Sequence, residues 1–379
     1  MMRIALVAPV IPDYGLEFAE VAGKRCQVDL FIADRFFTPK QPGANGGHRI
    51  EWVRWPRQRQ LATGMVMMYR LAQQIRRARP DVVHILAEGN LWSLALQTLL
   101  RPIPIVTTVH DVEFHPGDHA SQRVPRSLIN LLISRSDAIV VHGESLRRLI
   151  ATTLPRYNGP IFTFPHIPLV QYKRTADALG YARRAGSRKV LFFGRIYDYK
   201  GLDYLLEAAP RIRSAVPDVE IVVAGSGDIT KYEARLRTMD YVEVRNRFIP
   251  FEETARLFAE ADLLVLPYIE ASQSGVLMTA MAFGLPVVAT DVGEMSATIT
   301  ETGCGLLVPP RDANALARAI VSVLGNSALK DKLSTATLAA MANRYSAASL
   351  SAELEGLYNS VRSGRGSPAP RAIPGPECS

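Results

Sequence analysis

The chain has 379 residues, which is too long for one ordinary domain, so we expect two. Its hydrophobic content of 48% indicates a folded protein rather than a disordered one, and no apolar run approaches the roughly 20 residues that span a bilayer. The net charge of +8 lies almost entirely in residues 1–172, which hold 20 Lys and Arg against 13 Asp and Glu, so we expect an anionic partner for that part.

The first half of the chain alternates apolar strands with helices. The expected strands are Arg3–Val7, Gln27–Ala33, Ile50–Trp55, Asp81–Leu86, Ile103–Val109, Asp137–His142 and Ile161–Phe164. The expected helices are Leu16–Lys24, Gln60–Ala78, Leu91–Leu100, Pro125–Ser134 and Glu144–Leu154. Continuous apolar strands separated by helices predict a parallel sheet that is covered on both faces.

After a linker at 166–187, the same pattern starts again. The expected strands are Lys189–Phe193, Val219–Ala224, Tyr241–Ile249, Asp262–Pro267 and Pro286–Thr290. The expected helices are Gly201–Ala215, Thr230–Thr238, Phe251–Ala261, Gly275–Phe283, Asn314–Gly325, Ala328–Asn343 and Ala347–Val361. We therefore predict an α/β protein with two doubly wound domains, whose ligand site lies at the carboxyl ends of the strands.

The predicted division of the chain has four parts. Residues 1–172 form an N-terminal domain and residues 173–345 a C-terminal domain. A helix at 346–362 returns towards the N-terminal domain, and a Pro/Gly/Ser-rich tail at 363–379 is disordered.

The start of the chain and its cysteines predict a cytoplasmic protein. "MMRIALVAPVIPDYG" lacks a full signal-peptide apolar region and is better interpreted as a first core strand. The three cysteines are far apart and form neither a metal motif nor a disulfide framework.

Two cations follow the strand Lys189–Phe193. Arg195 and Lys200 stand in "GRIYDYKG", just before a helix, and their spacing allows both to face one diphosphate. The alternative is an ordinary solvated basic loop.

A second anion site is expected where "ASQSG" leads from the strand Asp262–Pro267 into a helix of small residues. The first N–H groups of a helix are unpaired and partly positive, and Gly275 lets the backbone come close to a ligand. The turn residues are Ser272, Gln273, Ser274 and Gly275. The alternative is a buried helix with a simple serine cap.

A histidine at a third strand end is a further candidate. The strand Ile103–Val109 delivers His110 to its carboxyl end, where the imidazole can contact a sugar hydroxyl or a departing phosphate. A structural hydrogen bond is the alternative. Asp111, His115 and Asp118 follow closely, but they do not share a helix face, so we predict no metal site.

Taken in order, four stretches resemble the C-terminal half of retaining GT-B glycosyltransferases of the GT4 group. They are "FFGRIYDYKGLDYLLEAA", "VEIVVAGSGD", "RFIPFEETARLFAEADLLVLPY" and "SGVLMTAMAFGLPVVATDVGE". The resemblance is close over residues 189–324 and looser in the first half, through "TTVHD" and "SDAIVVHGESLRRLI". It implies two Rossmann-like domains facing across a cleft, a nucleotide-sugar donor, no cofactor and no catalytic metal.

The resemblance also implies roles for particular residues. Arg195 and Lys200 match the family's diphosphate-binding pair, and His110 matches its cleft histidine. Ser274 and Gly275 match the amides that meet the donor's phosphate and sugar. Gly15 resembles, more loosely, the glycine of a loop after the first strand.

The chain departs from the family at its two usual glutamates, which are eight positions apart. Thr279 occupies the second position, so a shorter or absent ribose contact is expected. Ala271 occupies the first, with Glu270 one residue earlier, where a one-residue slip would bring it to the sugar as a catalytic residue.

The acceptor is expected on the N-terminal domain. "WVRWPRQRQ" mixes aromatic and basic side chains, and the helix that follows has apolar and Arg-bearing faces. Both could meet lipid at the inner face of the plasma membrane. The residues concerned are Trp52, Arg54, Trp55, Arg57 and Arg59. A core strand beside a solvated helix is the alternative.

The predicted function is transfer of a hexose from a GDP- or UDP-sugar to a glycan or lipid-linked acceptor, by family analogy in bacterial polysaccharide synthesis. The main alternative is a catalytically impaired relative that only binds the sugar nucleotide, a possibility that Thr279 motivates. A dinucleotide oxidoreductase lacks support because no strand is followed by G-x-G-x-x-G. A nucleic-acid binder lacks support because no aromatic RNA-binding motif or recognition helix is present.

Overall fold

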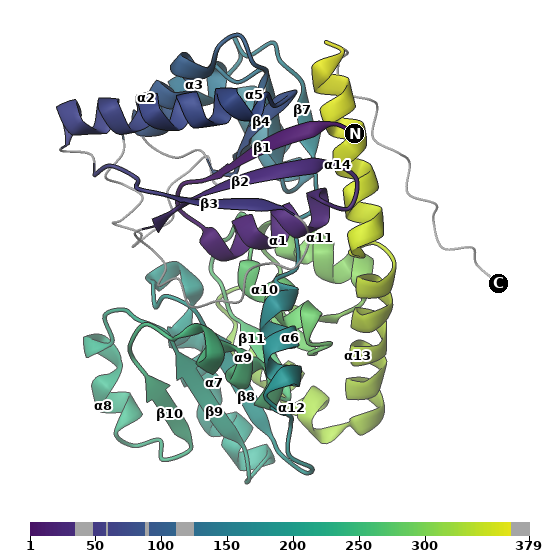
Figure 1. Cartoon of the computed structure of the whole chain (residues 1–379). Helices are drawn as coiled ribbons and strands as arrows, with labels where there is room; N and C mark the ends of the chain where they lie inside the picture. Colours follow the sequence, from purple (N-terminus) through teal and green to yellow (C-terminus); the bar gives the residue numbers. More distant parts are fainter. Residues whose placement is uncertain (35–47, 58–59, 88–90, 111–124, 365–379) are drawn as a thin grey trace.

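Two parallel sheets, stacked along the long axis of the molecule, form the framework of the protein (Figure 1). The computed structural model describes residues 1–34, 48–57, 60–87, 91–110 and 125–364. Both sheets are parallel throughout, which confirms the predicted pair of Rossmann-like, doubly wound units. The predicted tail beyond residue 364 lies outside the described residues.

The N-terminal sheet has seven strands in the order β3-β2-β1-β4-β5-β6-β7. The strands are β1 (Arg3–Ala8), β2 (Gln27–Ala33), β3 (Arg49–Val53), β4 (Val82–Ile85), β5 (Ile105–Val109), β6 (Ala138–Val141) and β7 (Ile161–Thr163). The helices of this half are α1 (Pro12–Ala22), α2 (Leu61–Ala78), α3 (Leu91–Leu100), α4 (Arg126–Ser134) and α5 (Glu144–Thr153). Helix α1 covers one face of the sheet, and α2 and α3 cover the other.

The C-terminal sheet has six strands in the order β10-β9-β8-β11-β12-β13. The strands are β8 (Lys189–Phe193), β9 (Glu220–Ala224), β10 (Val242–Arg245), β11 (Leu263–Leu266), β12 (Val287–Thr290) and β13 (Gly305–Val308). The helices are η3 (Asp198–Lys200), α7 (Leu202–Ala215), η4 (Thr230–Tyr232), α8 (Glu233–Leu236), α9 (Phe251–Glu260), α10 (Gly275–Ala282), α11 (Gly293–Thr302), α12 (Ala313–Gly325) and α13 (Ser327–Ala342). Helices α7 and α12 pack on one face, whereas α9, α10 and α11 pack on the other.

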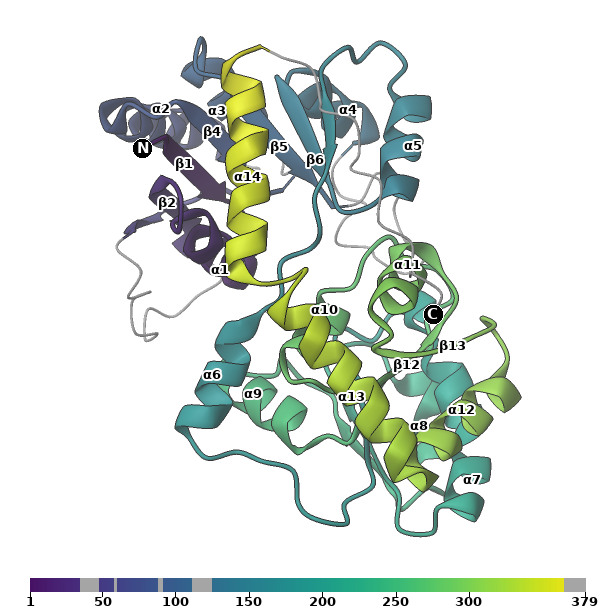
Figure 2. The same ribbon diagram turned by 90° about the vertical axis from the view of Figure 1, so that its right-hand side faces the viewer.

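The last helix, α14 (Ala347–Arg362), crosses back from α13 to the N-terminal half (Figure 2). Its apolar side chains join the same core as α1 and β1, and the Tyr358 hydroxyl lies 2.8 Å from Nδ1 of the buried His84 on β4. The two halves are therefore connected twice, before β8 and after α13.

The expected linker at 166–187 contains a helix, α6 (Val170–Ala178), which the sequence analysis missed. Only two of its side chains are buried, so its pattern resembles a solvated segment. Contacts from distant elements hold it: Tyr172 stacks on Phe251 at 4.4 Å between ring centroids, and Glu17 on α1 accepts the N–H of Gln171 at 2.5 Å. Helix α6 is therefore stabilised by these contacts with distant residues, one of which caps its first turn.

Other boundaries also differ from the expectation. Helix α11 and strand β13 were not predicted, because "GEMSATITET" is rich in Ser and Thr and β13 is a short edge strand. The predicted helix Thr230–Thr238 is two short pieces, η4 and α8, and the predicted strand Tyr241–Ile249 ends at Arg245.

Candidate active site

Lys200 lies buried between the ends of two neighbouring strands of the C-terminal sheet. It closes η3 after β8, and the next residue, Gly201, has φ of 68°. A side chain at Gly201 would overlap the carbonyl oxygen of Pro267 after β11, so only glycine lets the loop approach that strand. The glycine therefore allows the loop to bury Lys200 at the carboxyl ends of β8 and β11.

The ammonium group of Lys200 is shielded from solvent and, among the described residues, pairs with no carboxylate. The residue as a whole is 8% exposed, and its Nζ lies 3.1 Å from the Tyr268 hydroxyl. Burial lowers the pKa of Lys200, and the nearby Arg195 lowers it further. Within the described part of the chain, no ion pair joins Lys200 to an acid. A buried cation without a counter-ion is suited to bind an anion.

Arg195 is exposed and packs on an aromatic ring. Its guanidinium lies 5.0 Å from the centre of the Tyr197 ring, and Nη1 donates to the Tyr197 hydroxyl at 3.1 Å. The ion pairs among the described residues do not include it. The ring fixes the guanidinium, while its charge stays available.

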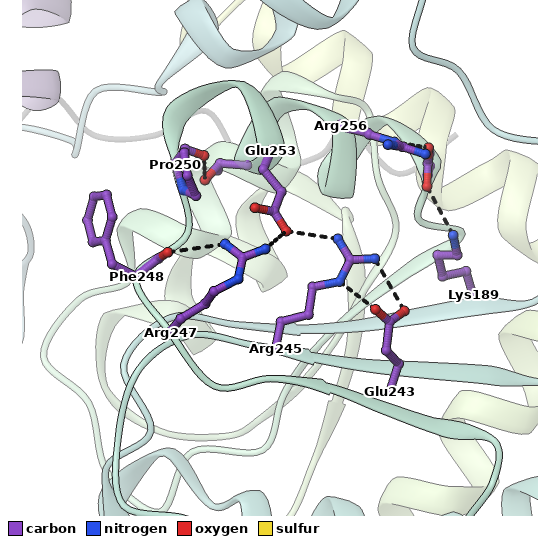
Figure 3. Close-up of polar contacts among 10 residues, drawn as sticks. Lys189, Glu243, Arg245, Arg247, Phe248, Pro250, Glu253 and Arg256 are labelled. Carbon is purple, nitrogen blue, oxygen red and sulfur yellow. Dashed lines mark hydrogen bonds and ion pairs between the residues drawn. The ribbon is translucent and has the colours of Figure 1, made fainter.

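The arginines at the end of the edge strand β10 behave differently (Figure 3). Glu253 lies between two guanidinium groups, 3.0 Å from Arg245 and 2.7 Å from Arg247, and Glu243 also pairs with Arg245 at 2.6 Å. The ring of Phe248 projects away from this network and is 79% exposed. Carboxylates neutralise these cations, so the network holds a loop rather than offering an anion site.

The predicted turn before α10 is present and adjoins the lysine. Ser274 is the N-cap of α10, and its Oγ accepts the N–H of Leu277 at 3.2 Å. Burial raises the pKa of Tyr268, the residue that contacts Lys200, to about 12, and the neighbouring side chain of Ser274 partly offsets that rise. The Ile269 N–H donates to the carbonyl of Tyr199 at 2.6 Å, which ties the two loops together. Lys200 and the N-terminus of α10 therefore lie in one region, at the carboxyl ends of β8 and β11.

The other residues expected in this turn have different environments. Glu270 is exposed, and Ser272 is half-buried. Gln273 donates from Nε2 to the carbonyl of His142 at 2.9 Å, so it joins the two halves. Thr279 is buried and its hydroxyl donates to the carbonyl of Gly275 within α10 at 2.8 Å.

The N-terminal half contributes three histidines that come from the ends of consecutive strands. His110 follows β5, His142 follows β6, and His166 stands three residues after β7. The ring centroids of His110 and His142 are 4.9 Å apart, and those of His142 and His166 are 5.0 Å apart. Tyr14 on α1 packs edge-on against His110 at 5.3 Å and lies 4.8 Å from His166. We call these four residues the histidine cluster.

Backbone carbonyls fix the protonation of these rings. His110 Nε2 lies 3.0 Å from the oxygen of Leu86, His142 Nδ1 lies 3.0 Å from that of Phe164, and His166 Nδ1 lies 3.0 Å from that of Ile167. A carbonyl only accepts, so each of these nitrogens carries the hydrogen. The second nitrogen of a neutral ring is then an acceptor; that of His142 accepts from the Tyr14 hydroxyl at 3.4 Å.

Burial keeps two of the rings neutral. It lowers the pKa of His166 to about 3 and that of His142 well below its ordinary value, and the neighbouring imidazoles lower both further. The sequence analysis singled out His110 alone. The signal it missed is that "IVVH" and "FTFPH" also place a histidine at or just after a strand end.

The two halves meet at the histidine cluster. A Cβ added to Gly275 would lie 3.7 Å from Cε1 and Nε2 of His166. Beside it, Glu294 on α11 accepts the N–H of Ser145 at 2.7 Å and the hydroxyl of the same residue. Glu294 thus caps α5 of the opposite half, whose own N-cap is Gly143.

Gly15 corrects one expectation. It does not stand in a loop after the first strand, because α1 already begins at Pro12. A Cβ on Gly15 would lie 2.6 Å from that of Ala8, so the glycine lets α1 pack closely on β1. The chain continues directly from the strand into the helix with too short a loop for the expected glycine turn.

The basic and aromatic stretch before α2 is split between core and surface. Trp55 is 3% exposed and belongs to the core, which contradicts its expected place on an acceptor or membrane surface, whereas Trp52 is 39% exposed. Arg54 and Arg57 line an open cavity of about 380 Å³ together with Asp34, Gln60 and others. Arg59 lies outside the described residues.

Metal-site candidates cannot be assembled from the described residues, where no group of three His, Cys, Asp or Glu is suitably placed. Asp111, His115 and Asp118 are outside that part of the chain. None of the helices in the described ranges is long and apolar enough to cross a bilayer.

Comparisons with known proteins agree with this architecture. A profile of "Glycosyl transferases group 1" matches residues 187–326, and one of "Glycosyltransferase Family 4" matches residues 14–166. The phosphatidyl-myo-inositol mannosyltransferase of Mycobacterium leprae is 34% identical over 295 residues, which cover 74% of each chain.

Solved structures show the same fold at lower identity. Sucrose-phosphate synthase from Thermosynechococcus elongatus superposes with a TM-score of 0.70 at 18% identity, covering 96% of this chain and all of the other. Anabaena HepE, solved in complex with UDP-glucose, superposes with a TM-score of 0.66 at 16% identity, covering 95% of this chain and 100% of HepE.

Proposed function

This chain belongs to the group 1 glycosyltransferases (family 4), and on that premise we propose that it moves a hexose from a GDP- or UDP-sugar to a glycan or lipid-linked acceptor, with retention of configuration. The observation that carries the proposal is the buried ammonium of Lys200, which pairs with no carboxylate of the described residues and lies near the N-terminus of α10. Positive charge beside the leaving diphosphate favours cleavage of the sugar–phosphate bond.

The chemistry follows from charge. As the sugar–phosphate bond breaks, the diphosphate gains negative charge and the sugar becomes oxocarbenium-like. Lys200, Arg195 and the N–H groups of Ser274 and Gly275 at the start of α10 would stabilise the departing diphosphate without a metal ion. The leaving phosphate can itself assist attack on the same face of the sugar, so no protein nucleophile is required.

The histidine cluster is the proposed sugar end of the site. His110 occupies the place of the family's cleft histidine, and its ring is fixed by the carbonyl of Leu86. Glu270 is exposed after β11 and is proposed as a carboxylate for the sugar. These roles are inferred from the resemblance and from the position of each residue at a strand end.

The acceptor is proposed to lie over the N-terminal half, at a membrane surface. The outer face of α2 exposes four large apolar side chains, and Arg54 and Arg57 are exposed nearby. The apolar residues are Leu61, Met65, Val66 and Tyr69. Apolar and cationic groups together suit an anionic lipid surface. The mycobacterial relative, by its name, acts on phosphatidyl-myo-inositol, which supports a lipid-linked acceptor.

A second candidate is a relative that binds the sugar nucleotide but transfers slowly. The observation in its favour is Thr279, whose hydroxyl bonds the helix backbone where the family usually has a glutamate. Release of free sugar or transfer to any acceptor would exclude this candidate.

Calorimetric titration of the chain with UDP, GDP and ADP tests the proposal and selects the nucleotide. We expect one of them to bind in the micromolar range, and the Lys200→Ala variant to lose most of that affinity. A wild-type protein that binds none of the three would contradict the proposed function. Lys332→Ala, an exposed lysine on α13, is the matched control.

A further inference from the structure

We propose that His166 is a specificity residue for the transferred sugar: its Nε2, as an uncharged acceptor, receives a hydrogen bond from a sugar hydroxyl. The inference rests on the proposed function and concerns the same cleft. It assigns a role to a histidine outside the set of family residues recognised in the sequence.

The orientation of the ring comes first. His166 Nδ1 donates to the carbonyl of the next residue, Ile167, at 3.0 Å, so Nδ1 carries the hydrogen. In the neutral ring, Nε2 then presents a lone pair. Among the described residues, Nε2 has no hydrogen-bond partner, unlike that of His142, which Tyr14 already occupies.

The position of the free nitrogen comes second. Nε2 and Cε1 of His166 lie 3.7 Å from where a Cβ of Gly275 would stand. The ring edge that carries Nε2 therefore lies against the first turn of α10, at the junction of the two halves. That distance is ordinary van der Waals contact, so a ligand group seated at Gly275 would touch the imidazole of His166.

The charge state decides what that group is. Three imidazoles lie within 6.2 Å of one another by ring centroid, and no carboxylate forms an ion pair with them among the described residues. A proton on one ring would be repelled by a proton on another, and burial also disfavours the charged form. A neutral acceptor repels phosphate oxygens, which carry no hydrogen at neutral pH, but accepts from a hydroxyl.

The two walls would therefore bind different parts of the sugar nucleotide. Lys200 and the N–H groups of α10 supply only donors, which match the diphosphate, whereas His166 supplies an acceptor, which matches the adjoining sugar. A site that offers a buried acceptor rejects analogues that lack the hydroxyl, because the acceptor is then left unpaired.

The test compares each nucleotide with its sugar. Calorimetry measures the affinities of UDP and UDP-glucose, and of GDP and GDP-mannose, for the wild type and two variants. His166→Phe keeps the ring volume and removes both nitrogens; His166→Gln keeps a polar group at the position of Nε2. We expect His166→Phe to weaken binding of the nucleotide-sugar about 10-fold or more and to leave the free nucleotide within about twofold. His166→Gln should recover part of the loss.

An equal loss for nucleotide and nucleotide-sugar would place His166 at the phosphate and overturn the inference, with the proposed function intact. No binding of any of the four probes by the wild type would contradict the proposed function, and the inference with it. A second readout needs no variant: ¹⁵N spectra of the histidine rings at pH 6 should show His166 neutral and protonated at Nδ1. An imidazolium there at pH 6 would also overturn the inference.

Discussion

The N-terminal and C-terminal walls of the proposed site both take their side chains from the carboxyl ends of parallel strands, yet they differ in charge. The N-terminal wall presents imidazoles that backbone carbonyls hold in place. The C-terminal wall presents Lys200 and Arg195, whose charges no acid among the described residues neutralises. The difference teaches that the local partner of a side chain, rather than the fold, decides which chemical group each wall can bind.

The largest expected effect comes from removing the buried cation. Lys200→Ala should lower turnover about 100-fold or more, because a preorganised donor to the leaving diphosphate is lost. Initial-rate kinetics with a nucleotide-sugar donor measure this effect. Lys332→Ala should keep wild-type rates. Near-normal turnover of Lys200→Ala would break the assignment of the C-terminal wall.

The next effect concerns the pH dependence of the free energy of unfolding. Burial raises the pKa of Glu17 on α1 to about 7, so the folded state binds a proton that the unfolded state releases above pH 4.5. This contribution to stability is complete at low pH and is lost as the pH rises towards 7. Between pH 5 and 8, the wild type should lose about 2 kcal/mol relative to Glu17→Gln.

Urea unfolding of both proteins at pH 5 and pH 8 measures that difference. The variant keeps an oxygen to accept the N–H of Gln171, the bond that Glu17 makes at 2.5 Å. Glu20→Gln on the same helix is the control, because the ion pair with Arg174 lowers the pKa of Glu20 and gives the opposite sign. Equal pH profiles for the wild type and Glu17→Gln would show that other groups control the stability.

A smaller effect distinguishes unpaired from paired arginines. Arg195→Ala should lower kcat/KM about 10-fold, because an exposed cation to the diphosphate is lost. Arg247→Ala should change kcat/KM by less than about twofold, since Glu253 already neutralises that arginine. Steady-state kinetics of the two variants side by side give the answer. Equal losses would mean that general basicity, rather than the position of Arg195, matters.

The smallest effect concerns the outer face of the N-terminal half. The double variant Met65→Ser/Val66→Ser should weaken flotation with vesicles containing phosphatidylglycerol about fivefold, because two half-exposed apolar side chains no longer enter the lipid. Leu338→Ser on α13, which is 55% exposed, should have no effect. Absence of wild-type binding to anionic and neutral vesicles alike would remove the membrane proposal.

Local sequence signals predicted the elements that carry their own apolar pattern. The strand before Arg195, the turn before α10 and the alternation of strands and helices were all visible in this way. Helix α6 was not visible, because Glu17 and Phe251, both distant in sequence, hold it in place.

The candidate site was predictable to a similar extent. The predicted strands put His110 and Lys200 beyond the carboxyl ends of strands, where the structure also has them. The contact of Glu294 with Ser145 joins residues 149 positions apart, so no local sequence signal reveals it. Trp55 looked like a surface aromatic because its neighbours are arginines, but tertiary packing buries it. Gly15 looked like a loop glycine because nothing in "PVIPDYG" shows that the helix begins at Pro12.

The most direct test of the charge difference between the walls is a crystal structure with the nucleoside diphosphate that calorimetry selects. We predict phosphate oxygens within about 3.2 Å of Lys200 Nζ and of the Gly275 N–H, with none in contact with His166 Nε2. A diphosphate bound against the histidine cluster, with the ammonium of Lys200 still on Tyr268 alone, would contradict the account.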